Sequence, residues 1–179
     1  MDDAYRAVEK IKNTNVWENM ANMCVKTGRL DVAEVCLSNM GDAKGARAVR
    51  EAKREPEAEA RIAMVALQLG QADEAERLYI SCGRYDLLNT MYQATGQWEK
   101  AVDMAQKKDR IHLKNTYYSW GRHLESSKDL TGAIQCYERA DAAKIEVPRM
   151  LYENNEIVTL ENYIKRAGDQ DLAKWMGQY

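Results

Sequence analysis

The strongest constraint on the fold is a short motif that recurs along the chain. A glycine is followed within four positions by an acidic residue and, at the fifth position, by an alanine. Copies occur at Gly28 to Ala33, Gly70 to Ala75, Gly96 to Ala101 and Gly168 to Ala173, and Lys128 to Ala133 is a copy without the glycine. Glycine ends a helix in a left-handed turn, acids favour the first turn of the next helix, and alanine permits close packing. The motif therefore predicts helical hairpins.

The spacing of the motif identifies the repeat class. From Gly28 to Gly168 the motif advances in four steps. Their mean length is close to the period of tetratricopeptide repeats, which is about 34 residues. We therefore expect an all-α, right-handed α-solenoid of tetratricopeptide-like hairpins, a class that binds partners rather than catalysing reactions.

The steps are uneven, so the predicted units are not identical. The steps from Gly28 to Gly70 and from Lys128 to Gly168 are long, and the step from Gly70 to Gly96 is the shortest. The shortest step leaves room for two helices of about ten residues joined at Gly83. Val147 precedes a proline and therefore predicts a helix boundary. The predicted hairpins are 14–41, 56–82, 83–108, 114–141 and 154–179, with extra helices near 3–12 and 42–54.

Large and small residues mark the packing face of these hairpins. Trp17 and Trp120 occupy bulky positions of first helices, Gly121 occupies a small position, and Tyr137 lies four residues after Ala133 in a second helix. Within each first helix, the bulky and small positions lie on one face. Tyr118 and Tyr152 fall outside this stripe, and tyrosines of that kind are enriched at interfaces.

Composition excludes several functions. The net charge is −2, so the chain lacks the basic footprint of a nucleic-acid-binding protein. No apolar run approaches the roughly 18 residues of a membrane span, so membrane insertion is not expected. The cysteines Cys24, Cys36, Cys82 and Cys136 are too far apart for a metal site and are expected to be buried free thiols of a cytosolic protein.

Nothing in the sequence predicts an enzyme or a cofactor. The two histidines, His112 and His123, have no nucleophile or orienting carboxylate at a recognisable spacing, and there is no phosphate-binding loop. One basic cluster, Lys107, Lys108 and Arg110 with Lys114, surrounds a predicted loop between hairpins. It is either a solvated helix end or a docking site for an acidic patch on a partner, with Tyr118 as a second docking candidate.

Neither end resembles a natural terminus. Residues 3–12 resemble the second helix of a hairpin, and the chain stops within a predicted helix. We therefore expect an internal slice of a longer solenoid, whose cut ends drive self-association of the isolated fragment. The apolar residues concerned are Ala4, Val8, Ile11, Leu172, Trp175 and Met176.

Several longer runs resemble the intraflagellar transport protein 140 family, the core subunits of ciliary transport complex A. These runs are Val16-Trp-Glu-Asn-Met-Ala, Met23-Cys-Val-Lys-Thr, Arg29-Leu-Asp-Val-Ala33, Gly45-Ala-Arg-Ala-Val-Arg50, Glu55-Pro-Glu-Ala-Glu-Ala-Arg61 and Glu146-Val-Pro-Arg-Met150. The resemblance implies a scaffold segment of retrograde transport trains that also supports import of membrane receptors into cilia. It implies location in the cytoplasm, the ciliary base and the axoneme, with other complex A subunits and cargo adaptors as partners.

Two alternatives stay open from the residues alone: a generic cytosolic tetratricopeptide peptide-binding module and a coat-type trafficking scaffold. A receptor for chaperone tails is disfavoured. That class holds a terminal carboxylate with Lys and Asn at fixed helix positions, and the corresponding residues here include Glu18 and Leu87 beside Asn22.

Overall fold

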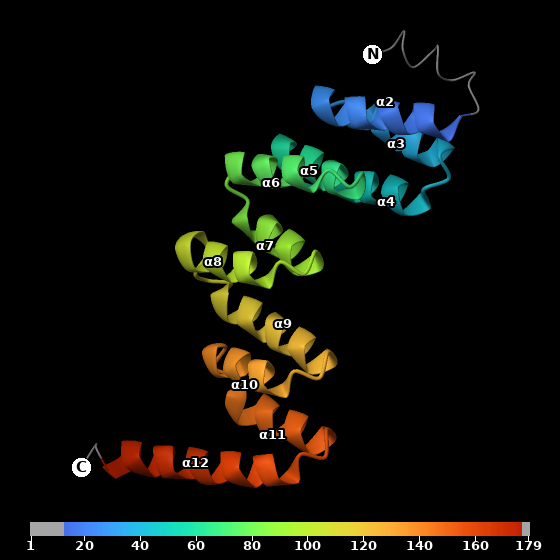
Figure 1. Cartoon of the computed structure of the whole chain (residues 1–179). Coiled ribbons are helices and arrows are strands. Elements are labelled where there is room, and N and C mark those ends of the chain that lie inside the picture. Colours follow the sequence, from blue (N-terminus) through green and yellow to red (C-terminus); the bar gives the residue numbers. More distant parts are fainter. Residues whose placement is uncertain (1–12, 177–179) are drawn as a thin grey trace. The chain divides into compact units, whose positions relative to one another are not determined.

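The structure is a computed structural model that describes the backbone of residues 13–176 and the side chains of residues 13–168. Within these residues the chain forms eleven α-helices and no β-strand (Figure 1). The all-α solenoid class predicted from the sequence is confirmed. The chain divides into two compact units, Met1–Leu88 and Asn89–Tyr179, and the boundary falls inside helix α7 (Tyr85–Ala94).

Apart from α7, each helix packs against the next helix along the chain within its own unit. The helices of the first unit are α2 (Thr14–Thr27), α3 (Leu30–Asn39), α4 (Ala43–Ala52), α5 (Ala58–Gln68) and α6 (Ala72–Ser81). Those of the second unit are α8 (Trp98–Lys108), α9 (Leu113–Ser126), α10 (Leu130–Arg139), α11 (Ala143–Glu153) and α12 (Ile157–Met176).

One kind of turn recurs between the helices. At each such turn a residue has a positive φ, and the N–H of the next residue donates to the carbonyl five residues earlier, which is the Schellman arrangement. Arg29 N donates to Cys24 O over 3.0 Å in this way, and so does Asp129 N to Leu124 O. In the described part of the chain the residues with positive φ are Gly28, Gly41, Gly70, Gly83, Gly96, Lys128, Asp141 and Asn155.

The spacing of these turns follows from helix length. The helices α3, α6, α7 and α10 each have 10 residues. Each of them lies between two turns of this kind, so the interval from one turn to the next is the same in all four cases. The pairs of turns are Gly28 and Gly41, Gly70 and Gly83, Gly83 and Gly96, and Lys128 and Asp141.

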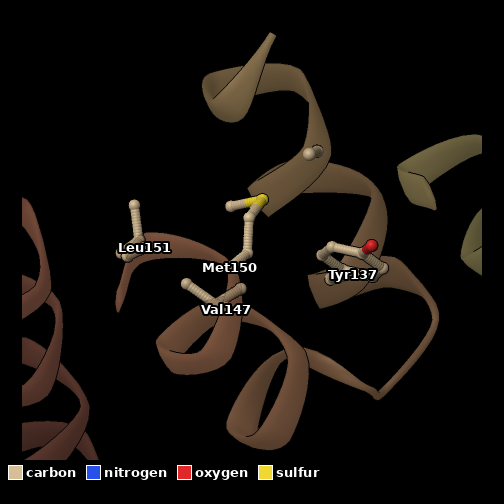
Figure 2. Close-up of a cluster of buried hydrophobic side chains, with 5 residues drawn as sticks. Tyr137, Val147, Met150 and Leu151 are labelled. Carbon is tan, nitrogen blue, oxygen red and sulfur yellow. The ribbon is translucent and has the colours of Figure 1, made fainter. Parts of the chain in front are cut away.

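The alanines of the motif lie where the helices meet. Ala33, Ala75, Ala101 and Ala133 are fully buried, with no exposed surface. Around Ala133 the second unit has a core cluster in which Tyr137 of α10 lies beside Val147, Met150 and Leu151 of α11 (Figure 2). A side chain larger than methyl at these alanines would separate the paired helices.

The turn predicted at Gly168, and with it the hairpin 154–179, is wrong. Helix α12 passes through Gly168 without a break, and the chain reverses earlier, at Asn155 (φ 63°). Leu160 and Tyr163 pack against the core cluster of α10 and α11, which fixes the inner face of α12. A glycine inside a helix costs only about 1 kcal/mol relative to alanine. The packing of Leu160 and Tyr163 is therefore enough to keep the chain helical through Gly168.

The helix boundary predicted at Val147 and Pro148 is also wrong, because Pro148 lies inside α11. A proline within a helix costs about 3 kcal/mol, since it removes one backbone hydrogen bond. Val147, Met150 and Leu151 on the same helix are buried, with 0%, 0% and 1% of their surface exposed. Burial of side chains of this size stabilises by about 1.5–3 kcal/mol each, which exceeds the cost of the proline.

Some expectations fall outside the described residues. They are the helix near 3–12, the side chain of Ala173, and the apolar surfaces expected around Ala4, Val8, Ile11, Leu172, Trp175 and Met176. The predicted extra helix near 42–54 corresponds to α4.

Candidate docking surface

The described residues offer neither a metal centre nor a membrane span. No group of three or more His, Cys, Asp or Glu side chains in that range is arranged to hold a metal ion. None of the helices searched combines the length and apolar character that crossing a membrane requires.

The basic cluster predicted from the sequence lies around the connection between α8 and α9. Lys107 forms an ion pair with Asp103 at 2.8 Å, and Lys114 forms one with Asp141. Within the described residues, Lys108 and Arg110 form no ion pair. Two of the four cations are therefore partly neutralised by neighbours, and the two nearest the tip are not.

An exposed isoleucine lies in the middle of this cluster. Ile111 is 90% exposed, more than any other large apolar side chain in the described range. The backbone around it forms a turn, in which His112 N donates to Asp109 O over 3.1 Å and the Asp109 carboxylate lies 2.7 Å from His112 Nδ1. We name residues 107–114 the docking loop. Sequence reasoning identified its cations but did not identify Ile111, because a lone apolar residue in a loop has no periodicity.

Tyr118, the other docking candidate, makes contacts within its own unit. Its hydroxyl donates to Glu146 Oε1 of α11 over 3.2 Å. Its ring packs against the core cluster, with the centroid 5.8 Å from that of Tyr137. Tyr118 is half-buried and joins α9 to α10 and α11, so part of its surface is occupied within its own unit. Tyr152, the other tyrosine outside the stripe, is 70% exposed.

A charged network that the sequence did not predict holds α9, α10 and α11 together. Arg149 donates to both carboxylate oxygens of Glu125, over 3.0 and 2.9 Å, and to Glu146 Oε2 over 2.8 Å. Tyr137 donates to Glu125 Oε2 over 2.6 Å. The pairing of Arg149 with Glu146 and Glu153 at three and four residues is visible in sequence, but its long-range partner Glu125 is not.

This network shifts the ionisation of its members. Burial raises the pKa of Glu125, but hydrogen bonds from Arg149 and then from Tyr137 outweigh it, so the net pKa is lowered. Burial and the hydrogen bond to Glu125 raise the pKa of Tyr137. The same carboxylates raise the pKa of Arg149. The three groups therefore stay in their bonded charge states near neutral pH and form a fixed support for the surface of this unit.

A second polar contact that the sequence did not predict links α7 to α9. Asn89 and Thr116 are both buried, and Asn89 Nδ2 donates to Thr116 Oγ1 over 2.7 Å. Thr116 Oγ1 donates to the carbonyl of His112 over 2.9 Å, and Gln93 Nε2 donates to Asn89 Oδ1 over 2.9 Å. Asn89 lies at the position of its repeat that corresponds to the small residue Gly121. A polar residue at this position was the only sign of the contact in the sequence.

The remaining predicted repeat positions are structural. Trp17 is 6% exposed, and Trp120 packs against the cluster of Val102, Tyr117 and Cys136. A Cβ at Gly121 would lie 2.9 Å from the ring of Tyr137, so a larger residue fits there only if the ring or a helix moves. Left-handed turns are formed by Gly28, Gly70 and Gly96.

The cysteines differ from one another in burial. Cys24, Cys36 and Cys136 are buried free thiols, whereas Cys82 is half-buried. The expectation that all four are buried is therefore wrong for Cys82, which caps the C-terminus of α6. A hydrogen bond to Cys36, together with burial, raises the pKa of Cys24.

Short stacked helices, left-handed turns and buried alanines at fixed positions define a tetratricopeptide-like helical-repeat domain. The profile of the tetratricopeptide-repeat (TPR) domain family shared by intraflagellar transport proteins 140 and 172 matches residues 1–179, and the chain belongs to this family. The match confirms that the chain is an intraflagellar transport TPR domain. The matched family includes both the 140 and the 172 proteins, so the match does not distinguish between them.

The chain is similar to curated intraflagellar transport proteins at low identity. It is 24% identical over 192 residues to the intraflagellar transport protein 172 homolog of Drosophila melanogaster, which covers 88% of this chain and 11% of that protein. The Danio rerio homolog of the same name is 24% identical over 170 residues, covering 77% and 10%. The intraflagellar transport protein 80 homolog of Rattus norvegicus is 26% identical over 112 residues, covering 59% and 14%. The chain thus spans only 10–14% of the length of these relatives.

Proposed function

We propose that this chain is a non-enzymatic scaffold segment of an intraflagellar transport particle, and more specifically of complex A. Family membership along the whole chain supports intraflagellar transport, and the resemblance to the 140 family supports complex A. Its partners are other subunits and cargo adaptors, in the cytoplasm, at the ciliary base and along the axoneme. Retrograde transport and import of membrane receptors into cilia are the processes it supports.

The docking loop is the observation that carries a partner-binding role. Ile111 is 90% exposed, and burying an isoleucine completely stabilises a complex by about 1.5–3 kcal/mol. Lys108 and Arg110 precede it in the loop, and an acidic partner can pair with both without breaking an ion pair within the described residues. An apolar tip next to two available cations fits an acidic protein surface with an apolar pocket.

The test replaces the tip of the docking loop in the full-length protein. Lys108→Glu, Arg110→Glu and Ile111→Asp together reverse the charge and remove the apolar contact. All three side chains are exposed, so the melting temperature of the domain is expected to stay within a few degrees of the original. We expect recovery of at least one complex subunit with the tagged protein from ciliated cells to fall about tenfold or more.

A matched control reverses charge elsewhere. Lys26 and Lys44 are exposed residues of the first unit, and Lys26→Glu with Lys44→Glu makes the same charge change as the two cation replacements in the loop. Recovery of every subunit should be normal in this control. Normal recovery in the loop variant would exclude the loop as a docking site. Recovery of a transport assembly other than complex A with the unaltered protein would overturn the complex A assignment alone.

A further inference from the structure

A groove lies between α10 and α12 on the second unit. It consists of two adjoining clefts, of about 410 Å³ and about 310 Å³, which share Thr131, Ile134 and Thr159 in their walls. Clefts that hold ligands in proteins usually measure about 300–1,000 Å³. The groove exists because α11 packs between its two neighbours, and Leu151 of α11 lines one of the clefts.

The walls of the groove are in register. The lining residues of α10 lie on one face, at 131, 134, 135 and 138, and those of α12 repeat the same spacing at 159, 162, 163 and 166. Because α11 reverses the chain between them, α10 and α12 run in the same direction (Figure 1). From 131 to 138 a helix rises about 10 Å, the length of about three residues of extended chain. With the adjoining cleft, which begins at Lys128, the groove matches four to five extended residues.

The side chains along the groove leave hydrogen-bonding groups available. Gln135 and Asn162 are exposed, and neither makes a hydrogen bond within the described residues. An amide side chain can donate to a carbonyl and accept from an N–H at the same time, which suits a peptide backbone. On the α10 wall, Ile134 supplies an apolar surface.

Opposite charges lie on the two walls at one end. Glu138 of α10 and Arg166 of α12 both line the larger cleft, and within the described residues they form no ion pair with each other or elsewhere. Both influence Tyr163 in the same cleft: its pKa is raised mainly by burial, then further by Glu138, and Arg166 opposes this. A ligand that lies between the walls would meet an acid on one side and a base on the other.

We propose that this groove binds an extended peptide segment of a protein partner. Successive side chains of an extended peptide point to opposite sides. A basic residue followed or preceded by an acidic one can therefore pair with Glu138 and Arg166 together, while Gln135 and Asn162 bind the peptide backbone. An aliphatic residue of the peptide then covers Ile134. This mode of binding is independent of the docking loop.

The experiment selects peptides from a phage-displayed random heptapeptide library on the immobilised chain. Adjacent basic and acidic residues, with an aliphatic residue nearby, are the expected common feature of the selected peptides. A selected peptide is then synthesised, and its Kd is measured by fluorescence anisotropy. The double variant Gln135→Ala with Asn162→Ala should raise that Kd about tenfold, the effect of losing two or more hydrogen bonds.

Exchanging the charges gives a second, independent readout. Glu138→Arg with Arg166→Glu should weaken the original peptide about tenfold and restore binding to a peptide whose basic and acidic residues are exchanged. The matched control is Glu161→Arg with Lys165→Glu, which makes the same exchange at exposed residues of α12 outside the groove. The control should leave the Kd within about twofold of the original.

Three outcomes would overturn the proposal. One is a selection that enriches no peptide, and another is a set of peptides that bind the groove variants as tightly as the original chain. The third is concentration-dependent dimerisation in sedimentation experiments that Ile134→Arg abolishes. That result would make the groove a contact between two copies of this chain instead of a peptide site.

Discussion

The substitution Gly121→Ala tests how closely α9 and α10 approach each other. Gly121 lies inside α9, and a Cβ built on it would lie 2.9 Å from Cε1 and 3.0 Å from Cδ1 of Tyr137. Carbon atoms in contact are normally about 3.5–4.0 Å apart. Either the tyrosine ring or one of the helices must therefore move to accept a single methyl group.

The ring has little freedom to move. Tyr137 is fully buried, and its hydroxyl donates to Glu125 Oε2 over 2.6 Å. Overpacking of a tight core costs about 1–3 kcal/mol. Replacing glycine by alanine inside a helix returns about 1 kcal/mol through helix propensity. We therefore expect Gly121→Ala to lower the free energy of unfolding by up to about 2 kcal/mol.

Gly168→Ala is the matched control. Gly168 is also inside a helix, but no atom of a neighbouring element lies within 4 Å of the position of its Cβ. Its replacement should therefore raise stability by up to about 1 kcal/mol. Urea unfolding followed by circular dichroism measures both variants, and hydrogen exchange shows whether the loss at Gly121 is confined to α9, α10 and α11. Equal stabilisation by both substitutions would refute the argument from close packing.

Three further predictions concern single features of the chain. Pro148→Ala should restore a regular α11 and raise the free energy of unfolding by about 1–3 kcal/mol, measured by urea unfolding. In the folded chain a thiol reagent should modify the half-buried Cys82 first and the buried Cys24 only after unfolding, which mass spectrometry of timed samples can show. The lowered pKa of Glu125 stabilises the fold above the pKa that this group has when unfolded, about 4.3, and that contribution is lost as pH falls through the folded value. Melting temperatures between pH 7 and pH 3 should therefore fall less steeply in Glu125→Gln than in the original chain, and parallel curves would contradict this.

The turns show what a sequence motif can and cannot predict. Gly28, Gly70 and Gly96 were identifiable because glycine adopts positive φ without steric cost. Asp141 and Asn155 form the same turn without glycine, and short polar residues that can adopt this conformation also occur at many other places. Neither is followed by an alanine at the fifth position, so the motif placed the last reversal at Gly168, where the chain continues as helix.

The polar contacts were harder to predict because they join residues far apart in sequence. Arg149 is 24 residues from Glu125, and Asn89 is 27 residues from Thr116. Helical periodicity predicts pairs three or four residues apart and says nothing about which helix packs alongside. Such contacts can be predicted only after the register of the neighbouring helices is known.

The internal contacts of Tyr118 were not predicted for the same reason. Judged from α9 and α10 alone, Tyr118 lies outside the packing stripe and should face a partner. In a stack of helices, however, each helix has a neighbour on both sides, and α11 supplies Glu146 and the buried Val147 beside Tyr118. The predicted boundary at Pro148 divided α11, so the sequence offered no continuous helix to cover that tyrosine. A residue outside the stripe of one hairpin therefore becomes a docking candidate only when the next helix also leaves it uncovered, as is the case for Ile111 at the tip of the docking loop.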